Sequence, residues 1–288
     1  MTLKSTINLL RPSHYIKNLF VLAPLFFAFK FNDIYMLEMS LLAFLCFSFF
    51  ASSIYILNDL RDVKEDRNHP SKRNRPIASG EISTKGAIIL MLGLLSLGIT
   101  IALLTNFNLF KILMIYLVLN IGYSLGLKHI PILDIFIVSV GFVLRIFAGA
   151  VTIDVPVTMW IILITFLLSL FLALAKRRDD IILAERGNKT RKNIDGYNLL
   201  FVNSGMIMMS AVVIVCYIFY TSSTDIQDKF GTHYLYITVI YVILGILRYM
   251  QITYVENNSG NPTKILIKDK FLQTTIFAWL ITFWIIVN

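Results

Sequence analysis

Charged residues are scarce in this chain. Only 15% of its 288 residues are Asp, Glu, Lys or Arg, 57% are hydrophobic, and the mean hydropathy is +0.74. Soluble domains carry about 25% charged residues. One soluble core of this size cannot hide so much apolar surface. The composition therefore excludes an ordinary soluble protein and predicts a membrane protein.

Cysteine is also scarce, with Cys46 and Cys216 as the only two. Each lies inside an apolar run without a CxxC partner or a metal ligand at suitable spacing. Both are interpreted as small hydrophobic residues rather than redox or metal-binding groups. The first residues show no signal-peptide pattern with a cleavable site, so we expect the first apolar run to stay in the mature protein.

Acidic residues are fewer than basic ones, 17 against 26. Such an excess fits either an anionic ligand or the Lys and Arg bias of cytoplasmic loops. No nucleic-acid partner is expected, because no basic domain stands apart from the hydrophobic segments.

Nine apolar segments are long enough, or nearly so, to span a membrane as helices. They predict an all-α, polytopic integral membrane protein with a single domain over residues 1–288. The first segment is the weakest because Pro24 interrupts it. The predicted spans are 15–31, 37–57, 86–105, 109–127, 133–152, 156–175, 198–220, 234–254 and 271–287.

The distribution of basic residues predicts the orientation. With the N-terminus inside, the segments on that side hold 21 of the 26 basic residues, whereas the outside connections hold three. Positive charge concentrates on the cytoplasmic side of membrane proteins. The N-terminus and the site are therefore expected to be cytoplasmic, in the plasma or inner membrane, with loops 58–85 and 176–197 capping the site.

A run of acidic residues begins at Asn58, at the predicted cytoplasmic end of the second span. If the helix continues, Asn58, Asp62 and Asp66 recur at every fourth position, and Asp59 joins their face. Stacked like charges repel one another, so something positive must lie against this face. Mg²⁺ commonly binds through one or two carboxylates together with substrate phosphates. The spacing predicts that Asn58, Asp62 and Asp66 hold Mg²⁺.

The alternative is a solvated helix end whose acids pair with Arg61, Lys64 and Arg67. The acids and the asparagine share one face at the membrane boundary, and this placement favours the metal site.

Basic residues follow the acidic run. Lys72 and Arg75 suit phosphate oxygens, the lysine as a point charge and the arginine as a bidentate fork. His69 precedes a proline, and no second histidine stands at ligand spacing. We interpret His69 as structural, although a ligand role stays open.

These motifs resemble a known family. Asn58-Asp59-x-x-Asp62-x-x-x-Asp66-Arg67, followed by Arg75-Pro76, resembles the first aspartate motif of the UbiA superfamily of intramembrane prenyltransferases. Tyr123-Ser124-x-x-Leu127-Lys128 is similar to a second block of that family, and nine helices is the architecture that the resemblance implies.

One departure narrows the resemblance. Aromatic prenyltransferases of the superfamily usually carry a second aspartate-rich motif, but the stretch after Lys128 holds only Asp134, with Val138 four residues later. Basic residues stand out instead: Lys176 and Arg177 at the end of the sixth span, and Arg145 within the fifth. An intramembrane charge usually faces a cavity or a partner. For Arg145 the alternative is a structural pair with an acid such as Asp134.

The combination is similar to the decaprenyl-phosphate phosphoribosyltransferase branch. This resemblance implies Mg²⁺-dependent transfer of 5-phosphoribose from phosphoribosyl diphosphate to a polyprenyl phosphate. Asp59, Asp62 and Asp66 are the expected catalytic residues. The sequence allows a homo-oligomer but does not determine the oligomeric state. The residues expected to bind substrate are Lys17, Asn58, Arg67, Lys72, Arg75, Tyr123, Lys128, Arg145, Lys176, Arg177 and Arg248.

Two other functions were weighed. An aromatic prenyltransferase would use the same acidic face for a prenyl diphosphate, with Asp134 as the remnant of a second site. A transporter or channel would spread polar residues through several spans. Here the charges collect at one membrane face, which disfavours a transport pathway.

Overall fold

The computed structural model describes residues 2–68, 72–185 and 196–287. The described residues form helices and no strand, which confirms the all-α fold class. They divide into two compact units: unit 1 contains Met1–Gly126 and Gly141–Val157, and unit 2 contains Leu127–Val140 and Thr158–Asn288. The single domain over 1–288 stays a prediction. His69 and part of the 176–197 loop lie outside the described residues.

Eight helical segments among the described residues are long and apolar enough to cross a membrane. The chain is therefore an integral membrane protein. Seven of them are single helices: α3 (Ile34–Arg61), α5 (Thr84–Thr105), α6 (Phe107–Leu125), α7 (Leu133–Thr152), α8 (Met159–Glu185), α9 (Leu199–Ser222) and α13 (Lys270–Val287). The eighth segment, Tyr234–Tyr254, consists of η5 (Tyr234–Thr238) followed by α11 (Val239–Tyr254).

The first of the nine predicted spans does not form one long helix. The 3₁₀-helix η1 (Pro12–Leu22) is followed by the short α2 (Ala23–Phe27). Pro24 has no N–H to continue a helical hydrogen-bond ladder, and it lies in the first turn of α2, where prolines are tolerated. The described residues thus contain eight long spans rather than nine, with a broken helical segment in place of the first.

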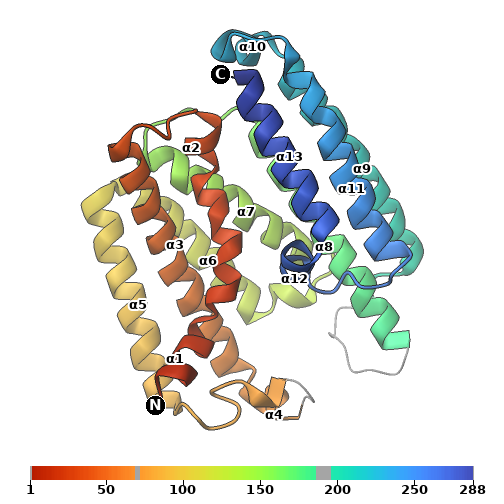
Figure 1. The fold of residues 1–288 in the computed structure, drawn as a ribbon. Coiled ribbons are helices and arrows are strands. Elements are labelled where there is room, and N and C mark those ends of the chain that lie inside the picture. Colours follow the sequence, from red (N-terminus) through yellow and green to blue (C-terminus); the bar gives the residue numbers. More distant parts are fainter. Residues whose placement is uncertain (1, 69–71, 186–195, 288) are drawn as a thin grey trace. The chain divides into compact units, whose positions relative to one another are not determined.

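Unit 1 is built around α3, which packs against α1 (Leu3–Leu10), η1, α5 and α6. Figure 1 shows α5 beside α3. The short α4 (Val63–Arg67) and η2 (Lys72–Asn74) follow α3. Gly149 of α7 lets that helix approach η1, because a Cβ atom there would lie 1.8 Å from the carbonyl oxygen of Val21. The unit therefore brings the N-terminal segment, α3 and part of α7 into contact.

Unit 2 contains α8 packed along α9 and α11 packed against α13 (Figure 1). Its buried core includes Phe171, Leu174, Val202, Met206 and Tyr249. The short helices of the unit are η3 (Leu127–His129), α10 (Thr224–Phe230) and α12 (Pro262–Lys268).

Candidate functional site

The acidic motif lies where α3 passes into α4, with Asp62 between the two helices. The Asp62 N–H donates to the Asn58 carbonyl at 2.9 Å, and the Asp66 N–H donates to the Asp62 carbonyl at 2.8 Å. These are the i to i−4 bonds of an α-helix. Two helical hydrogen bonds thus bridge the junction, but the continuous helix expected from the spacing is interrupted at Asp62, which has a φ of −90° and a ψ of 8°.

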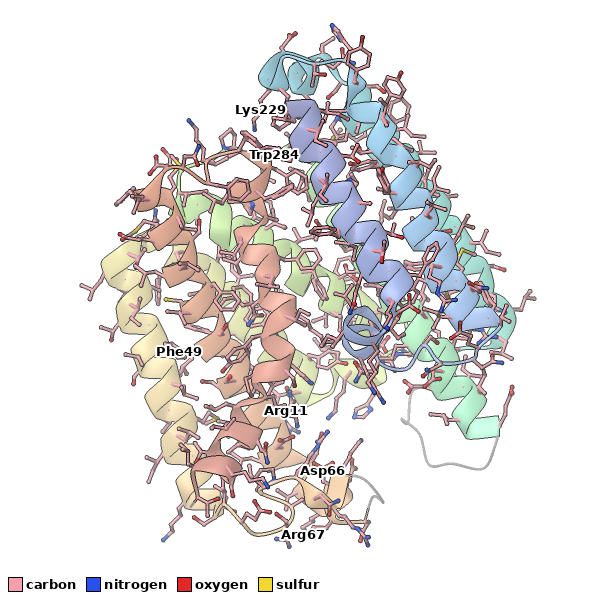
Figure 2. The ribbon with its side chains drawn as sticks, viewed as in Figure 1. Arg11, Phe49, Asp66, Arg67, Lys229 and Trp284 are labelled. Carbon is pink, nitrogen blue, oxygen red and sulfur yellow. The ribbon has the colours of Figure 1, made fainter. Side chains whose placement is uncertain are left out.

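Two of the acids are buried and share an arginine. Asp59 and Asp66 are each 2% exposed. Nη1 of Arg75 lies 3.0 Å from Asp59 Oδ1 and 2.7 Å from Asp66 Oδ2, and Nη2 of Arg11 lies 2.5 Å from Asp59 Oδ1. Figure 2 shows Arg11 and Asp66 at the same end of unit 1. The two arginines supply the positive charge that the stacked acids require.

Local structure brings both arginines to this point. Arg11 caps the end of α1 in a left-handed conformation with a φ of 54°. Arg75 lies in a turn in which its N–H donates to the Lys72 carbonyl at 2.9 Å. Leu9 of α1 and Ile77, which follows the turn, belong to one buried apolar cluster. The cluster fixes the backbone on both sides and leaves the two guanidinium groups within reach of α3.

Asn58 connects the acidic motif to the Tyr123-Ser124 block. Its Oδ1 accepts a hydrogen bond from Ser124 Oγ at 2.6 Å. Tyr123 is the preceding residue on α6 and is half-buried. The two sequence blocks are therefore neighbours in unit 1.

Arg145 of α7 is buried in unit 1, where it is 5% exposed. It donates to Asn18 Oδ1 at 3.0 Å, to the Gly141 carbonyl at 2.7 Å and to the Tyr116 hydroxyl at 3.3 Å. Its guanidinium also lies 4.6 Å from the centre of the Phe47 ring. These partners are all neutral, so the structure gives no support to the alternative of a structural pair with an acid.

Lys17 lies on η1 beside this cluster and is half-buried. It is within electrostatic range of both Arg145 and Arg11. Among the described residues, no acid lies within ion-pair distance of its ammonium group. Arg11 is paired with Asp59, so the positive charges that a bound anion could balance here are those of Lys17 and Arg145. The substrate-binding role of Lys17 stays a prediction.

Replacing Arg145 with lysine is expected to lower kcat/KM about 100-fold, the scale on which misplaced reacting groups slow an enzyme. Lysine cannot reproduce three fixed hydrogen bonds together with planar stacking on aromatic rings. Asn18, which follows Lys17, would keep its hydrogen bond to Ser48 but lose the one from Arg145. Steady-state kinetics on the purified variant checks this, with exposed Lys111→Gln as the control. Undiminished activity would contradict a positioning role for Arg145.

The donor set at α3 and α4 suits Mg²⁺ only with help from a substrate. Asn58, Asp62 and Asp66 offer hard oxygen atoms at helical spacing. In the part of the chain that the structure describes, no three His, Cys, Asp or Glu residues form a metal-binding group on their own. Mg²⁺ commonly completes its shell with substrate phosphates and water. The residues therefore fit a cation that arrives with a phosphate ligand.

Unit 2 holds a buried ion pair that involves two predicted residues. Arg177 Nε donates to Asp134 Oδ2 at 2.8 Å, and Arg177 Nη1 contacts Asp180. Arg177 is 4% exposed and Asp134 is fully buried. The charge of Arg177 is thus balanced within unit 2.

Tyr197 was not predicted from the sequence, yet it completes this cluster. Its hydroxyl donates to Asp134 Oδ1 at 2.5 Å and accepts from the Ile132 N–H at 2.6 Å. Burial and the contact with Asp134 raise the pKa of Tyr197 well above its usual value. The hydroxyl therefore stays protonated and remains a donor. A lone tyrosine after a charged loop gave no signal of this role.

Arg248 of α11 is also engaged by acids in unit 2. Its guanidinium lies 2.7 Å from Asp269 and 2.9 Å from Glu256. The hydrogen bond from Arg248 holds the pKa of the Asp269 carboxyl below its usual range. The structure thus shows Arg248 in an ion pair next to the start of α13, and its substrate-binding role stays a prediction.

The predicted site residues are divided between the two units. Arg67 is exposed and donates to the Ala78 carbonyl at 3.2 Å, and Lys72 is exposed on η2. Both belong to the same unit as the acidic motif. In unit 1 lie Lys17, Asn58, Asp59, Asp62, Asp66, Arg67, Lys72, Arg75, Tyr123 and Arg145, and in unit 2 lie Lys128, Lys176, Arg177 and Arg248.

Comparisons with known proteins agree with the resemblance drawn from the motifs. Residues 19–188 match the model of the UbiA prenyltransferase family. Decaprenyl-phosphate phosphoribosyltransferase from Mycolicibacterium smegmatis is 36% identical, and the match covers 95% of this chain and 89% of that protein. The protein of that name from Corynebacterium glutamicum is 34% identical, with 95% and 84% covered.

A solved structure shows the same fold. A UbiA homolog from Archaeoglobus fulgidus, bound to GPP and Mg²⁺, has a TM-score of 0.69 at 20% identity, with 96% of this chain and 99% of that chain covered. The sequence prediction of the family is confirmed by the family match and by these relatives. The chain is an integral membrane transferase that belongs to the UbiA prenyltransferase family.

Proposed function

We propose that the protein transfers 5-phosphoribose from phosphoribosyl diphosphate to a decaprenyl-type polyprenyl phosphate and releases diphosphate. Relatives named decaprenyl-phosphate phosphoribosyltransferase, which match 95% of the chain, support this reaction. The excess of basic residues in the predicted inside segments supports an active site at the cytoplasmic face of the plasma membrane. Both substrates are polyanions, which suits the basic residues near the acidic motif.

The ion pair of Asp134 is the observation that favours phosphoribosyl diphosphate over a prenyl diphosphate as the donor. Between His129 and Val143, Asp134 is the one acid, so it alone could stand there for a second aspartate motif. It is buried and neutralised by Arg177 and Tyr197. Arg177 is itself only 4% exposed, so it is not placed to turn away and let Asp134 bind a second cation for a prenyl diphosphate. This favours a donor that needs only the acidic motif at α3 and α4.

Asn58, Asp62 and Asp66 would hold Mg²⁺, which when bound neutralises charge on the diphosphate leaving group. An oxygen of the lipid phosphate forms the new bond to ribose C1 as the bond from C1 to the diphosphate oxygen breaks. The nucleophile is already anionic at neutral pH, so the reaction requires no strong base. Carboxylates of the motif would favour the positive charge that develops on the ribose.

The basic residues of unit 1 would bind the phosphate groups of the two substrates. Arg67, Lys72 and Arg75 follow the acidic motif and would bind phosphate oxygens of the donor. Lys17, with Arg145 beside it, would screen the lipid phosphate and hold it for attack. Lys128, Lys176, Arg177 and Arg248 stay predicted substrate contacts in unit 2.

A donor assay tests the proposal. Purified protein in detergent, given labelled phosphoribosyl diphosphate, Mg²⁺ and decaprenyl phosphate, is expected to form a labelled lipid. Chelation of the metal with EDTA should stop the reaction, and added Mg²⁺ should restore it. A parallel reaction contains a labelled prenyl diphosphate and an aromatic acceptor. Transfer in that second reaction alone would replace the proposal with an aromatic prenyltransferase.

A further inference from the structure

The contact between Arg75 and two acids of the motif has a further consequence for metal binding. One nitrogen, Nη1 of Arg75, lies within 3.0 Å of carboxylate oxygens from both Asp59 and Asp66. A divalent cation bound to Oδ2 of Asp66 would have to share that oxygen atom with Arg75. Two cations cannot share that position, because like charges in a poorly solvated site repel strongly.

The charges of Asp59 and Asp66 are already balanced without a metal ion. Asp59 and Asp66 carry two negative charges, and Arg11 and Arg75 carry two positive charges against them. With Asp62, another proposed ligand, the three acids and two arginines carry one net negative charge, so an added divalent cation would leave one net positive charge unless an arginine moves away. Without Arg75, the three acids and Arg11 carry two net negative charges, which a divalent cation balances.

Arg75 is the residue able to leave. Its side chain is 28% exposed and contacts the proposed ligand Asp66, whereas the side chain of Arg11 is 21% exposed and contacts Asp59. Its backbone is held in place, since the neighbouring Pro76 and Ile77 are buried and the Ser79 N–H donates to the Arg75 carbonyl at 2.8 Å. The guanidinium can therefore turn away from the acids without unfolding the turn that carries it.

We infer that Arg75 is an exchangeable counter-ion: it holds the acids in the metal-free enzyme and moves to the diphosphate when the cation binds. This inference rests on the proposed function, because it assumes that the acids bind a cation together with a diphosphate. A guanidinium pairs as well with phosphate as with carboxylate. The enzyme would bind the metal ion weakly in the absence of diphosphate and tightly in its presence. The movement of Arg75 would cause this dependence of metal affinity on diphosphate.

Metal binding without turnover tests this inference. Mn²⁺ binding to the purified protein is measured by electron paramagnetic resonance, with and without inorganic diphosphate, after correction for the Mn²⁺–diphosphate complex in solution. For Arg75→Gln we expect Mn²⁺ alone to bind about tenfold more tightly than to the unmodified protein. The extra tightening caused by diphosphate should shrink by a similar factor, since coupling between two ligands is reciprocal.

Two further variants complete the test. Arg73→Gln removes the same charge two residues away from an exposed position and should bind Mn²⁺ as the unmodified protein does. Arg75→Lys keeps a charge that can reach one carboxylate at a time, and it should bind Mn²⁺ with intermediate affinity. It also replaces Arg75→Gln if that variant fails to fold in a thermal unfolding assay.

The outcomes separate this inference from the proposed function. If Arg75→Gln and Arg75→Lys bind Mn²⁺ no more tightly than the unmodified protein, or respond as strongly to diphosphate, the counter-ion role is wrong. The donor assay can still succeed in that case. If Mn²⁺ binding changes as expected but no phosphoribose is transferred, the role of Arg75 stands and the proposed substrate is wrong.

Discussion

Asp62→Ala is expected to lower metal-dependent transfer about a thousandfold or more. A bound metal ion supplies several kcal/mol of charge stabilisation, and each 1.36 kcal/mol is a factor of ten in rate. Asp62 is half-buried at the junction of α3 and α4, in the middle of the three residues proposed as ligands. Its carboxylate is thus the central ligand of the proposed site.

The variant is expected to keep its fold. Asp62 caps the C-terminal end of α3, and its backbone N–H bonds to the Asn58 carbonyl whatever the side chain is. Aspartate is also not favoured near a helix C-terminus, where the helix dipole disfavours negative charge. Removal of the carboxylate should therefore change thermal unfolding little.

Three measurements check the prediction: the transfer rate from labelled donor, Mn²⁺ binding, and the thermal unfolding temperature in detergent. Glu65→Gln is the matched control, because it removes an exposed carboxylate from the adjacent α4. That variant should retain its activity. Normal turnover by Asp62→Ala would exclude the acidic face from the mechanism.

The sequence was sufficient to predict the parts of the site that depend on local spacing. Asn58, Asp62 and Asp66 follow a long apolar helix at intervals of four residues, and the structure retains the corresponding backbone hydrogen bonds. A hydrogen-bond ladder links near neighbours, so a local pattern predicts it well. The long spans follow equally from apolar runs of sufficient length.

The partners of the acids could not be predicted in this way. Arg11 and Asp59 are 48 residues apart in the chain, and Asp134 and Tyr197 are 63 apart. Such contacts depend on how whole helices pack against one another, and the local spacing of residues in the sequence does not predict them. The break in the first predicted span could be predicted only in part from the sequence. Pro24 signalled a weakness there, but its sequence position alone did not exclude a continuous helix.

The second large effect is expected for the ion pair in unit 2. Replacing Arg177 with methionine should lower the free energy of unfolding by about 3–5 kcal/mol, the usual cost of leaving one partner of a buried pair uncompensated. Asp134 is fully buried and would lose the Nε–H donor at 2.8 Å. Asp134→Asn should cost less, because Arg177 would still have Asp180 as a partner.

A double variant separates charge from packing. Arg177→Met combined with Asp134→Leu removes both charges and fills the space with apolar atoms, which is often tolerated where a buried pair is replaced as a unit. We expect it to unfold at a higher temperature than Arg177→Met alone. Thermal unfolding in detergent checks the order, with exposed Lys264→Met as the control. If Arg177→Met matches the unmodified protein, the ion pair does not stabilise unit 2.

Activity of the double variant then decides between two roles for Arg177. The residue was predicted to bind substrate, but its guanidinium is already bonded to Asp134 and Asp180. If the double variant recovers both stability and transfer, Arg177 serves the fold. If stability returns while transfer stays lost, Arg177 must also act on a phosphate, and one guanidinium would then serve both the ion pair and the substrate. Stability and rate measured on the same preparations distinguish these results, because a purely structural role predicts that they recover together.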